Sequence, residues 1–395
     1  MTKRVLLLSY AYPPLQAPES WLSAKAVAGL RAHDVLTTVV AARPRWWHST
    51  DETLVSFAHE AADGVLVVET PRWLPIVQPV SWLRQFPDPM RFLHRRAVCA
   101  IETIEPESFD AMITWSQWHS VHLVGLSVKR RHPSLRWLAH FSDPWVDNPL
   151  VRHHRVARAR NRVYEHKVVH AADVIETTSP ETLERLVARH PTMRATSGVL
   201  PHAFAPTLYS GSPPTTGPIV FRYVGAFYAG RTAEPLVRGL AALGGAVGDV
   251  RVELIGRADH AEELARRAGL PNGRVVVRDH VSYLDSLRLM READVLLLVD
   301  GVADTNLFVA SKLIDYIGAG RPVVGLTPPG MAADVIRRMG GWVADPRDVP
   351  AISDALASAL AAVRRARGAP WGDGATRAEF EVDEVGRRRR ELLFG

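Results

Sequence analysis

Short apolar runs recur along the whole chain and alternate with stretches whose apolar positions follow the period of a helix. Each run has the length of one strand and is bounded by turn residues, as is typical of buried parallel strands. This alternation predicts an α/β fold with doubly wound parallel sheets. The expected strands are Arg4–Ser9, Val35–Ala41, Val65–Thr70, Ala111–Thr114, Arg136–His140, Asp173–Thr178, Ile219–Val224, Val250–Ile255, Val275–Val277, Val295–Val299, Pro322–Leu326 and Gly341–Val343.

Helical periodicity fills most of the intervals between these strands. One helix has a clear start in Thr178-Ser179-Pro180-Glu181, where a capping residue precedes proline and an acidic side chain. The other expected helices are Trp21–Leu30, Phe92–Ile104, Val121–Lys129, Val151–Ala171, Ala233–Leu243, Ala261–Ala268, Tyr283–Arg291, Ser311–Ile317 and Val349–Arg367.

The segment Ala205–Pro218, APTLYSGSPPTTGP, interrupts the alternation and is the best linker candidate. It predicts a first domain over 1–206, a linker over 207–218 and a second domain over 219–375. The charged tail 376–395 is expected to be a helix, with packing back toward the first domain as one option. Its run Arg387–Arg390 is interpreted as a solvated face in preference to a nucleic-acid or membrane contact.

Another irregular segment, Pro71–Met90, combines five prolines with tryptophan and leucine residues. It fits neither periodicity, so it is expected to be a surface excursion. A loop packed on its own domain is favoured over one that shapes an acceptor pocket or touches a membrane.

Composition narrows the class of protein without selecting a ligand. The 395 residues are 47% hydrophobic and 23% charged, with a net charge of +6, as expected of a globular two-domain protein. The positive charge could attract nucleic acid, an anionic membrane surface or a nucleotide. A single cysteine, Cys99, permits no internal disulfide and suits a cytoplasmic location, with attachment to the inner membrane face left open.

The most informative stretch is DTNLFVASKLIDYIGAGRP, Asp304–Pro322, which joins two expected strands. A helix that starts at Ser311 would present its N-terminus above the carboxyl ends of the strands, where phosphate binds in such folds. Ser311 is expected to cap this helix, and Lys312 adds a positive charge in its first turn. Asp315, one turn further on, could accept hydrogen bonds from a ribose diol.

SKLIDYIGAGRPVV resembles the donor-binding signature of the retaining, family-4-like glycosyltransferases with the GT-B fold. That fold has two Rossmann-like domains facing across a cleft. The resemblance implies that Asp315 holds the ribose, while Ser311 and Lys312 lie near the diphosphate. A second similar segment, VGAFYAGR, implies a diphosphate contact from Arg231, whose guanidinium can hold two phosphate oxygens.

The first domain carries two candidate loops for catalysis and acceptor binding. HFSDPWVDNP resembles an Asp-Pro-Trp motif of this family, so Asp143 could orient an acceptor hydroxyl or the donor sugar. Trp145 could stack on a sugar, although a packed turn is the alternative. Asp147, which stands nearby next to Asn148, favours a functional role for Asp143. WSQWHSVH offers Trp118 for the acceptor and His119 for catalysis, against a capping or packing histidine.

Two positions depart from the family pattern. Leu307 stands where these enzymes have a glutamate that contacts the donor sugar, and Ala226 replaces an arginine. The first loop, Tyr12–Ser20, also lacks the usual Gly-Gly pair. These departures leave open a nucleotide- or sugar-binding protein without full activity.

The expected function is transfer of a sugar from a nucleotide-diphosphate donor to an acceptor hydroxyl, without a metal or cofactor. UDP, GDP and TDP are not distinguished, and the acceptor is a small molecule, glycan or lipid-linked molecule. No Asp-x-Asp motif or metal-spaced His/Cys set was identified. A retaining reaction is favoured; in an inverting one, Asp143 or His119 would be the base. The weaker alternative is transfer to nucleic-acid bases, suggested by Trp46 and Trp47 among arginines.

Overall fold

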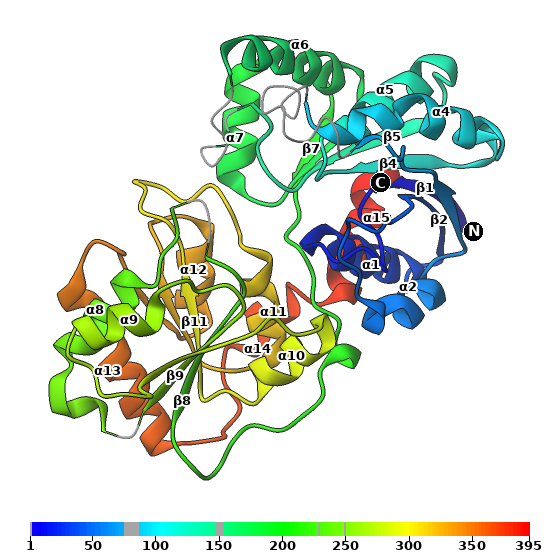
Figure 1. The fold of residues 1–395 in the computed structure, drawn as a ribbon. Coiled ribbons are helices and arrows are strands. Elements are labelled where there is room, and N and C mark those ends of the chain that lie inside the picture. The colour runs from blue at the N-terminus through cyan, green and yellow to red at the C-terminus, as the bar shows by residue number, and fades with distance from the viewer. Residues whose placement is uncertain (1, 75–86, 147, 149–153, 228–229, 249) are drawn as a thin grey trace. The chain divides into compact units, whose positions relative to one another are not determined.

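The computed structural model describes residues 2–74, 87–146, 148, 154–227, 230–248 and 250–395. These residues form two compact units, each built on one parallel sheet (Figure 1). Unit 1 comprises Met1–Ala203 together with Val382–Gly395, and unit 2 comprises Phe204–Glu381. The prediction of two Rossmann-like α/β domains is therefore confirmed.

The sheet of unit 1 has seven strands in the order β3-β2-β1-β4-β5-β6-β7, and every neighbouring pair is parallel. The apolar run predicted as the first strand forms β1 near the middle, where both faces are covered and Val5, Leu6 and Leu7 are fully buried. The strands are β1 (Lys3–Leu8), β2 (Val35–Ala42), β3 (Gly64–Val68), β4 (Ala111–Trp115), β5 (Arg136–Phe141), β6 (Val174–Thr177) and β7 (Thr196–Val199).

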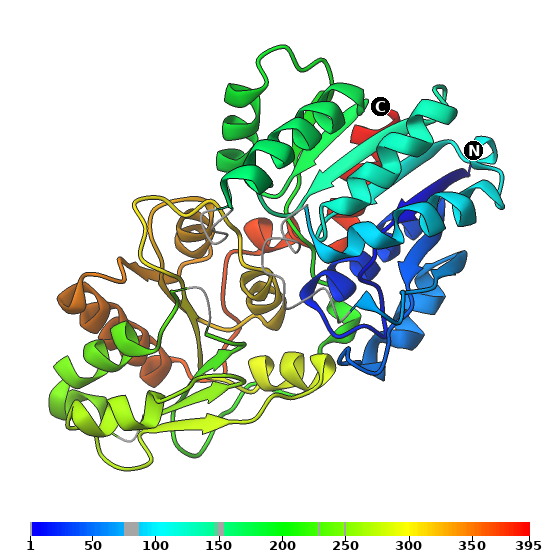
Figure 2. The same cartoon turned by 45° about the horizontal axis from the view of Figure 1, so that its top comes forward.

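Helices cover both faces of this sheet (Figures 1 and 2). One group packs around α1 and the other around α5. The first contains α1 (Pro18–Arg31), α2 (Val55–Ala61) and α15 (Val382–Phe394). The second contains α4 (His94–Glu102), α5 (Ser120–Arg131) and α6 (Arg155–Ala171), and α7 (Pro180–Arg189) lies between β6 and β7 in the chain. Ser179 caps α7, as its sequence predicts.

Helix α15 brings the end of the chain into unit 1. It packs against α1, and Gly29 and Gly386 lie so close that a Cβ on Gly386 would meet the Gly29 carbonyl oxygen at 2.2 Å. Arg389 is buried and donates hydrogen bonds to both carboxylate oxygens of Glu176 in β6. The expectation of a wholly solvated face was therefore wrong for Arg389, although Arg387 is exposed.

The sheet of unit 2 has six parallel strands in the order β10-β9-β8-β11-β12-β13. They are β8 (Val220–Val224), β9 (Arg251–Ile255), β10 (Val275–Arg278), β11 (Val295–Val299), β12 (Val323–Leu326) and β13 (Trp342–Ala344). The helices are α8 (Glu234–Ala242), α9 (Ala261–Arg267), α10 (Tyr283–Arg291), α11 (Ser311–Ala319), α12 (Met331–Arg338), α13 (Val349–Arg365) and α14 (Gly374–Ala378).

Short 3-10 turns also occur in both units, at Glu52–Leu54, Pro89–Leu93, Pro106–Ser108, Pro206–Leu208 and Gly244–Val247. The middle of the proline-rich excursion lies outside the described residues. Of its ends, Leu74 is buried in the core and Asp88 caps the turn Pro89–Leu93. Among the described helices, none combines the length and the apolar character needed to cross a membrane.

Candidate functional site

The crossover helix α11 follows β11 and its loop, as the sequence predicts, but its N-terminus differs in detail. Ala310 is the capping residue and makes no side-chain cap, while Ser311 is the first residue inside the helix. The expectation that Ser311 caps α11 was therefore wrong. The first-turn backbone N–H groups still point toward the carboxyl ends of the strands, which preserves the geometry of an anion site.

Lys312 sits at this helix start beside the end of β8. Its Nζ donates a hydrogen bond to the Tyr223 hydroxyl at 2.7 Å and lies 4.0 Å from the centre of that ring. Burial, followed by the nearby Arg231 guanidinium, lowers the pKa of Lys312 to about 7, against the opposing effect of Asp300. Such an ammonium gains from a ligand that brings negative charge.

Arg231 reaches the same place from the segment after β8. Its Nη2 lies 3.3 Å from Asp300 Oδ1, and both side chains are largely buried. The other Asp300 oxygen accepts hydrogen bonds from Asn306 at 2.9 Å and Thr327 at 2.8 Å, which fix the carboxylate. Asp300 at the end of β11 thus positions Arg231 next to Lys312. Asp300 could not be recognised from the sequence, because its partners Arg231 and Thr327 lie in two other loops.

Two glycines let the strand-end loops approach Lys312. Gly225 has φ +135°, and a Cβ there would lie 2.7 Å from Lys312 Nζ. Gly256, at the end of β9, has φ +108°, and its Cβ would lie 2.5 Å from the Gly225 carbonyl oxygen. Glycine is required at both places because of this close approach and the positive φ. The loops after β8 and β9 are therefore in contact beside the lysine.

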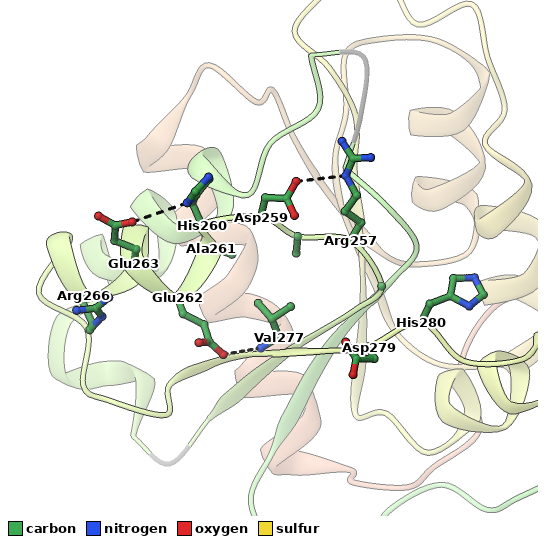
Figure 3. A pocket seen from close by; sticks show the side chains of 12 residues that line it. Arg257, Asp259, His260, Ala261, Glu262, Glu263, Arg266, Val277, Asp279 and His280 are labelled. Atoms are coloured by element: carbon green, nitrogen blue, oxygen red, sulfur yellow. Dashed lines mark hydrogen bonds and ion pairs between the residues drawn. The ribbon is translucent and has the colours of Figure 1, made fainter. Parts of the chain in front are cut away.

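A pocket of about 580 Å³ continues from Gly256 along the ends of β9 and β10 (Figure 3). Arg257 and Asp259 form an ion pair of 3.2 Å on one side. Glu262 accepts a hydrogen bond from the backbone of Val277 at 2.9 Å. The remaining lining residues are Ala258, His260, Ala261, Glu263, Arg266, Asp279 and His280. The sequence predicted the strands around this pocket but not the pocket itself.

Asp315 lies on α11 and is buried. Its Oδ1 accepts a hydrogen bond from the Tyr283 hydroxyl at 3.0 Å, and its backbone carbonyl accepts one from Tyr209 at 3.0 Å. Burial and the nearby Asp315 carboxylate raise the pKa of both tyrosines, so each hydroxyl stays protonated and donates. Ribose binding by Asp315 remains a prediction. Leu307, in the loop before α11, is buried and apolar.

In unit 1 the ends of β4 and β5 carry a second group of polar residues. Asp143 follows β5 and accepts a hydrogen bond from Gln117 at 3.3 Å. Its neighbour is Glu19, a buried residue of α1 that accepts hydrogen bonds from the Trp115 indole at 2.8 Å and the Ser142 hydroxyl at 3.1 Å. Burial, then the charge of Asp143, raises the pKa of Glu19 to about 8.

Glu19 is therefore protonated at neutral pH and lies next to Asp143. A buried carboxyl group whose pKa is raised in this way is typical of functional sites. The sequence did not reveal Glu19, because a glutamate in the first turn of a helix is commonplace. Its partners lie 96 and 123 positions further along the chain.

The aromatic candidates of unit 1 belong to the packing of the domain. Trp145 is 2% exposed and stacks on the His119 ring, with 5.0 Å between the ring centres. Trp118 is partly buried and packs on the same core cluster. His119 stands at the capping position of α5 without a side-chain cap. Of the alternatives for Trp145, packing is favoured; Asp147 lies outside the described residues.

No family model and no curated protein sequence matches the chain. Solved structures, in contrast, match over nearly its full length. HepE of Anabaena in complex with UDP and glucose is 15% identical, with a TM-score of 0.65 and 99% of each chain covered. A glycosyltransferase from Rickettsia africae ESF-5 is 13% identical, with a TM-score of 0.68 and 99% of this chain and 98% of that one covered.

A third match is sucrose-phosphate synthase from Thermosynechococcus elongatus, at 16% identity and a TM-score of 0.62, with 100% of this chain and 95% of that one covered. These likenesses show that the chain has the GT-B type of fold, with two Rossmann-like domains. At such identities they establish the fold alone.

Proposed function

We propose that the chain is a glycosyltransferase that moves a sugar from a UDP-sugar to an acceptor hydroxyl. The observation that carries this proposal is the pair of cations Lys312 and Arg231 at the start of α11. They lie beside glycine loops in a fold whose solved relatives include one with UDP and glucose. In this proposal the two cations and the helix N-terminus bind the diphosphate, Asp315 binds the ribose and the pocket after β9 receives the base.

The same cations supply the chemistry. The bond between the sugar and the diphosphate breaks as negative charge builds up on the leaving phosphate. Fixed positive charges in a partly dry site stabilise that charge in the transition state. We propose that they do so without a metal ion and that the reaction retains the anomeric configuration. Adding Mg²⁺ or Mn²⁺ should then leave the rate unchanged, and NMR of the product should show the donor's anomer.

The acceptor is proposed to bind to unit 1, near Asp143 and the protonated Glu19. Asp143 would orient the acceptor hydroxyl, and its chemistry suits a small molecule, a glycan or a lipid-linked acceptor. Replacement of Asp143 by Asn should then raise the KM for the acceptor. An inverting enzyme would instead lose about 10²- to 10⁴-fold in kcat through the missing general base.

The direct test measures nucleotide binding and turnover. Thermal shift with UDP, GDP, TDP and ADP should show stabilisation by UDP, and Asp315→Ala should abolish it. Release of UDP from UDP-sugars should then follow in the presence of acceptor panels. Buried Leu307 favours one alternative, a nucleotide-binding protein without turnover. UDP binding with no release of UDP from any donor would support that alternative, and no nucleotide binding would reject both.

A further inference from the structure

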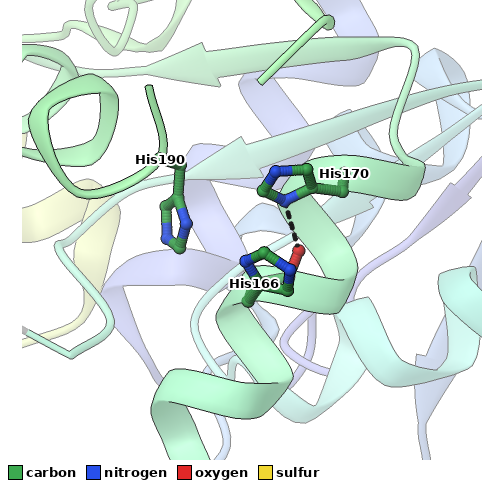
Figure 4. A group of neighbouring side chains, drawn as sticks. All are labelled: His166, His170 and His190. Atoms are coloured by element: carbon green, nitrogen blue, oxygen red, sulfur yellow. Dashed lines mark hydrogen bonds between the residues drawn. The ribbon is translucent and has the colours of Figure 1, made fainter. Parts of the chain in front are cut away.

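Three histidines of unit 1 come together at α6 and the end of α7 (Figure 4). His166 and His170 lie one turn apart on α6, and His190 follows the last residue of α7. The ring centres of His166 and His170 are 4.0 Å apart, and each lies 5.7 Å from the ring centre of His190. One ring nitrogen from each histidine lies within 4.8 Å of the other two.

Hydrogen bonds prepare two of these rings to bind a cation. His190 Nε2 lies 3.0 Å from the buried Glu165 carboxylate, so it carries the proton and Nδ1 keeps its lone pair. His170 Nδ1 lies 2.8 Å from the His166 backbone oxygen, which by the same reasoning leaves the lone pair on Nε2. Thr192 Oγ1 lies 3.1 Å from that Nε2 and can rotate away. Metal-binding histidines usually have such a partner on the second nitrogen.

The charges around the group also bear on cation binding, because a metal binds the neutral form of the imidazole ring. Glu165 provides a compensating negative charge behind His190. Arg189 Nη1 also contacts the Glu165 carboxylate, at 2.5 Å.

We propose that His166, His170 and His190 bind one divalent transition-metal ion, of the kind represented by Zn²⁺. Imidazole nitrogens suit this class of ion, and a fourth position would be left to water. The rings of His166 and His170 are exposed, so they can turn to the bond length of about 2.0–2.1 Å that Zn²⁺ requires. His166 and His170 are four positions apart, so both side chains lie on one face of α6.

The ion would act structurally, because it joins α6 to the end of α7. Glu165 extends this effect, since its second carboxylate oxygen accepts a hydrogen bond from the Val146 backbone at 3.1 Å. Val146 belongs to the loop that carries Asp143 and Trp145. Metal binding would thus stabilise the α6–α7 corner and, through Glu165, the end of that loop. The inference does not depend on the proposed transfer reaction.

The test uses the full chain after removal of metals with a chelator. Isothermal titration with ZnCl₂ should show one ion per chain, and CoCl₂ should give the visible absorption of a tetrahedral site. The variants His166→Ala and His170→Ala should each bind at least about 100-fold more weakly, since even loss of an outer partner costs 10–100-fold. Both side chains are exposed on a helix, where alanine preserves the fold.

His59→Ala is the matched control, because His59 is an exposed histidine on another helix of unit 1. It should bind Zn²⁺ like the wild type, and Zn²⁺ should raise the melting temperature of both. Equal Zn²⁺ affinity in the wild type and in the double variant His166→Ala/His170→Ala would overturn the proposal. Absence of Zn²⁺ and Co²⁺ binding to the folded wild type would overturn it as well.

Discussion

A partly buried ammonium beside a guanidinium is a costly arrangement unless an anion joins it. Asp300 offsets only part of the charge at Lys312 and Arg231, and the pKa of Lys312 falls to about 7. A diphosphate would reverse this effect, because its charge favours the ammonium form. In the ligand-free protein, Lys312 and Arg231 therefore repel each other, and binding of a diphosphate would relieve this repulsion.

Replacement of Lys312 by Gln should weaken UDP binding by about 10- to 100-fold, as expected for one hydrogen bond to a charged group. In the wild type the affinity should be highest below pH 7. It should fall as the pH rises above 7, because the ligand-free lysine then loses its proton and must regain it on binding. Titrations of UDP from pH 6 to 9 measure this dependence, which Lys312→Gln should lack.

Arg365→Ala is the control for this change, since Arg365 is exposed at the end of α13 in the same unit. It should retain the affinity of the wild type and its pH dependence. If both variants lost the same UDP affinity, the effect would come from the overall charge of the protein and not from the site at α11.

Glu19 permits a prediction on stability. Its pKa is about 8 in the folded protein and near 4.5 when unfolded, so the unfolded state loses its proton first as the pH rises. The contribution of Glu19 is complete below pH 4.5 and declines between 4.5 and 8, by at most about 1.4 kcal/mol per pH unit. Glu19→Gln keeps an acceptor for Trp115 and should remove this decline.

Urea unfolding at pH 5 and pH 8 measures the effect. Glu19→Gln should gain stability relative to the wild type at the higher pH. Glu60→Gln, at an exposed position of α2, should follow the wild type at both values. If the free energy of unfolding changed by the same amount between pH 5 and pH 8 in Glu19→Gln and in the wild type, the prediction would be contradicted.

Among the helices and strands, the sequence predicts most accurately those whose side chains are buried on every face. Runs such as that of β1 are apolar on both faces, so their strands were recognised. The edge strand β7 (TSGV) is not predicted because its exposed positions leave no apolar run. The short helices α2 and α12 are not predicted either. The α11 crossover can be predicted from contiguous residues, whereas Asp300, Glu19 and His190 acquire their distant partners only through folding.

Gly225 tests the loop that approaches α11. Alanine there should strain a backbone with φ +135° and push the Lys312 ammonium away from its place beside Tyr223. Gly269 also has a positive φ, +77°, but a Cβ there would meet nothing within 4 Å. Both substitutions should lower stability by about 1–2 kcal/mol for the backbone strain. Only Gly225→Ala should also weaken UDP binding, measured by titration; equal affinity of the two variants would reject a role for this approach.

In the whole molecule, the two units differ in the number of chain segments that form them. Unit 2 is one continuous segment, Phe204–Glu381, with its own core. Unit 1 is completed only by the last residues of the chain, where Arg389 pairs with Glu176 across 213 positions. Sequence pattern could not show this, because an arginine-rich helix end looks solvated until its buried carboxylate is known.

Separate expression of the two parts tests this difference. The fragment 204–381 should fold by itself, melt cooperatively and gain melting temperature from UDP, because its core and the Lys312 group are internal to it. The fragment 1–203 should be unstable, since removal of α15 uncovers α1 and leaves the Glu176 charge without its main partner.

The contribution of the Arg389–Glu176 pair to the stability of unit 1 can be measured in the full chain. Arg389 and His140 hold the pKa of Glu176 at about 2 against the opposing effect of burial, so the carboxylate is charged at neutral pH. Arg389→Ala would leave a buried charge without the guanidinium, at a cost of about 3–5 kcal/mol. Arg387→Ala is the control on the exposed side of the same helix. If unit 1 is completed by α15, Arg389→Ala lowers the melting temperature of unit 1 and leaves UDP binding by unit 2 intact; a stable fragment 1–203 would refute this division of the chain.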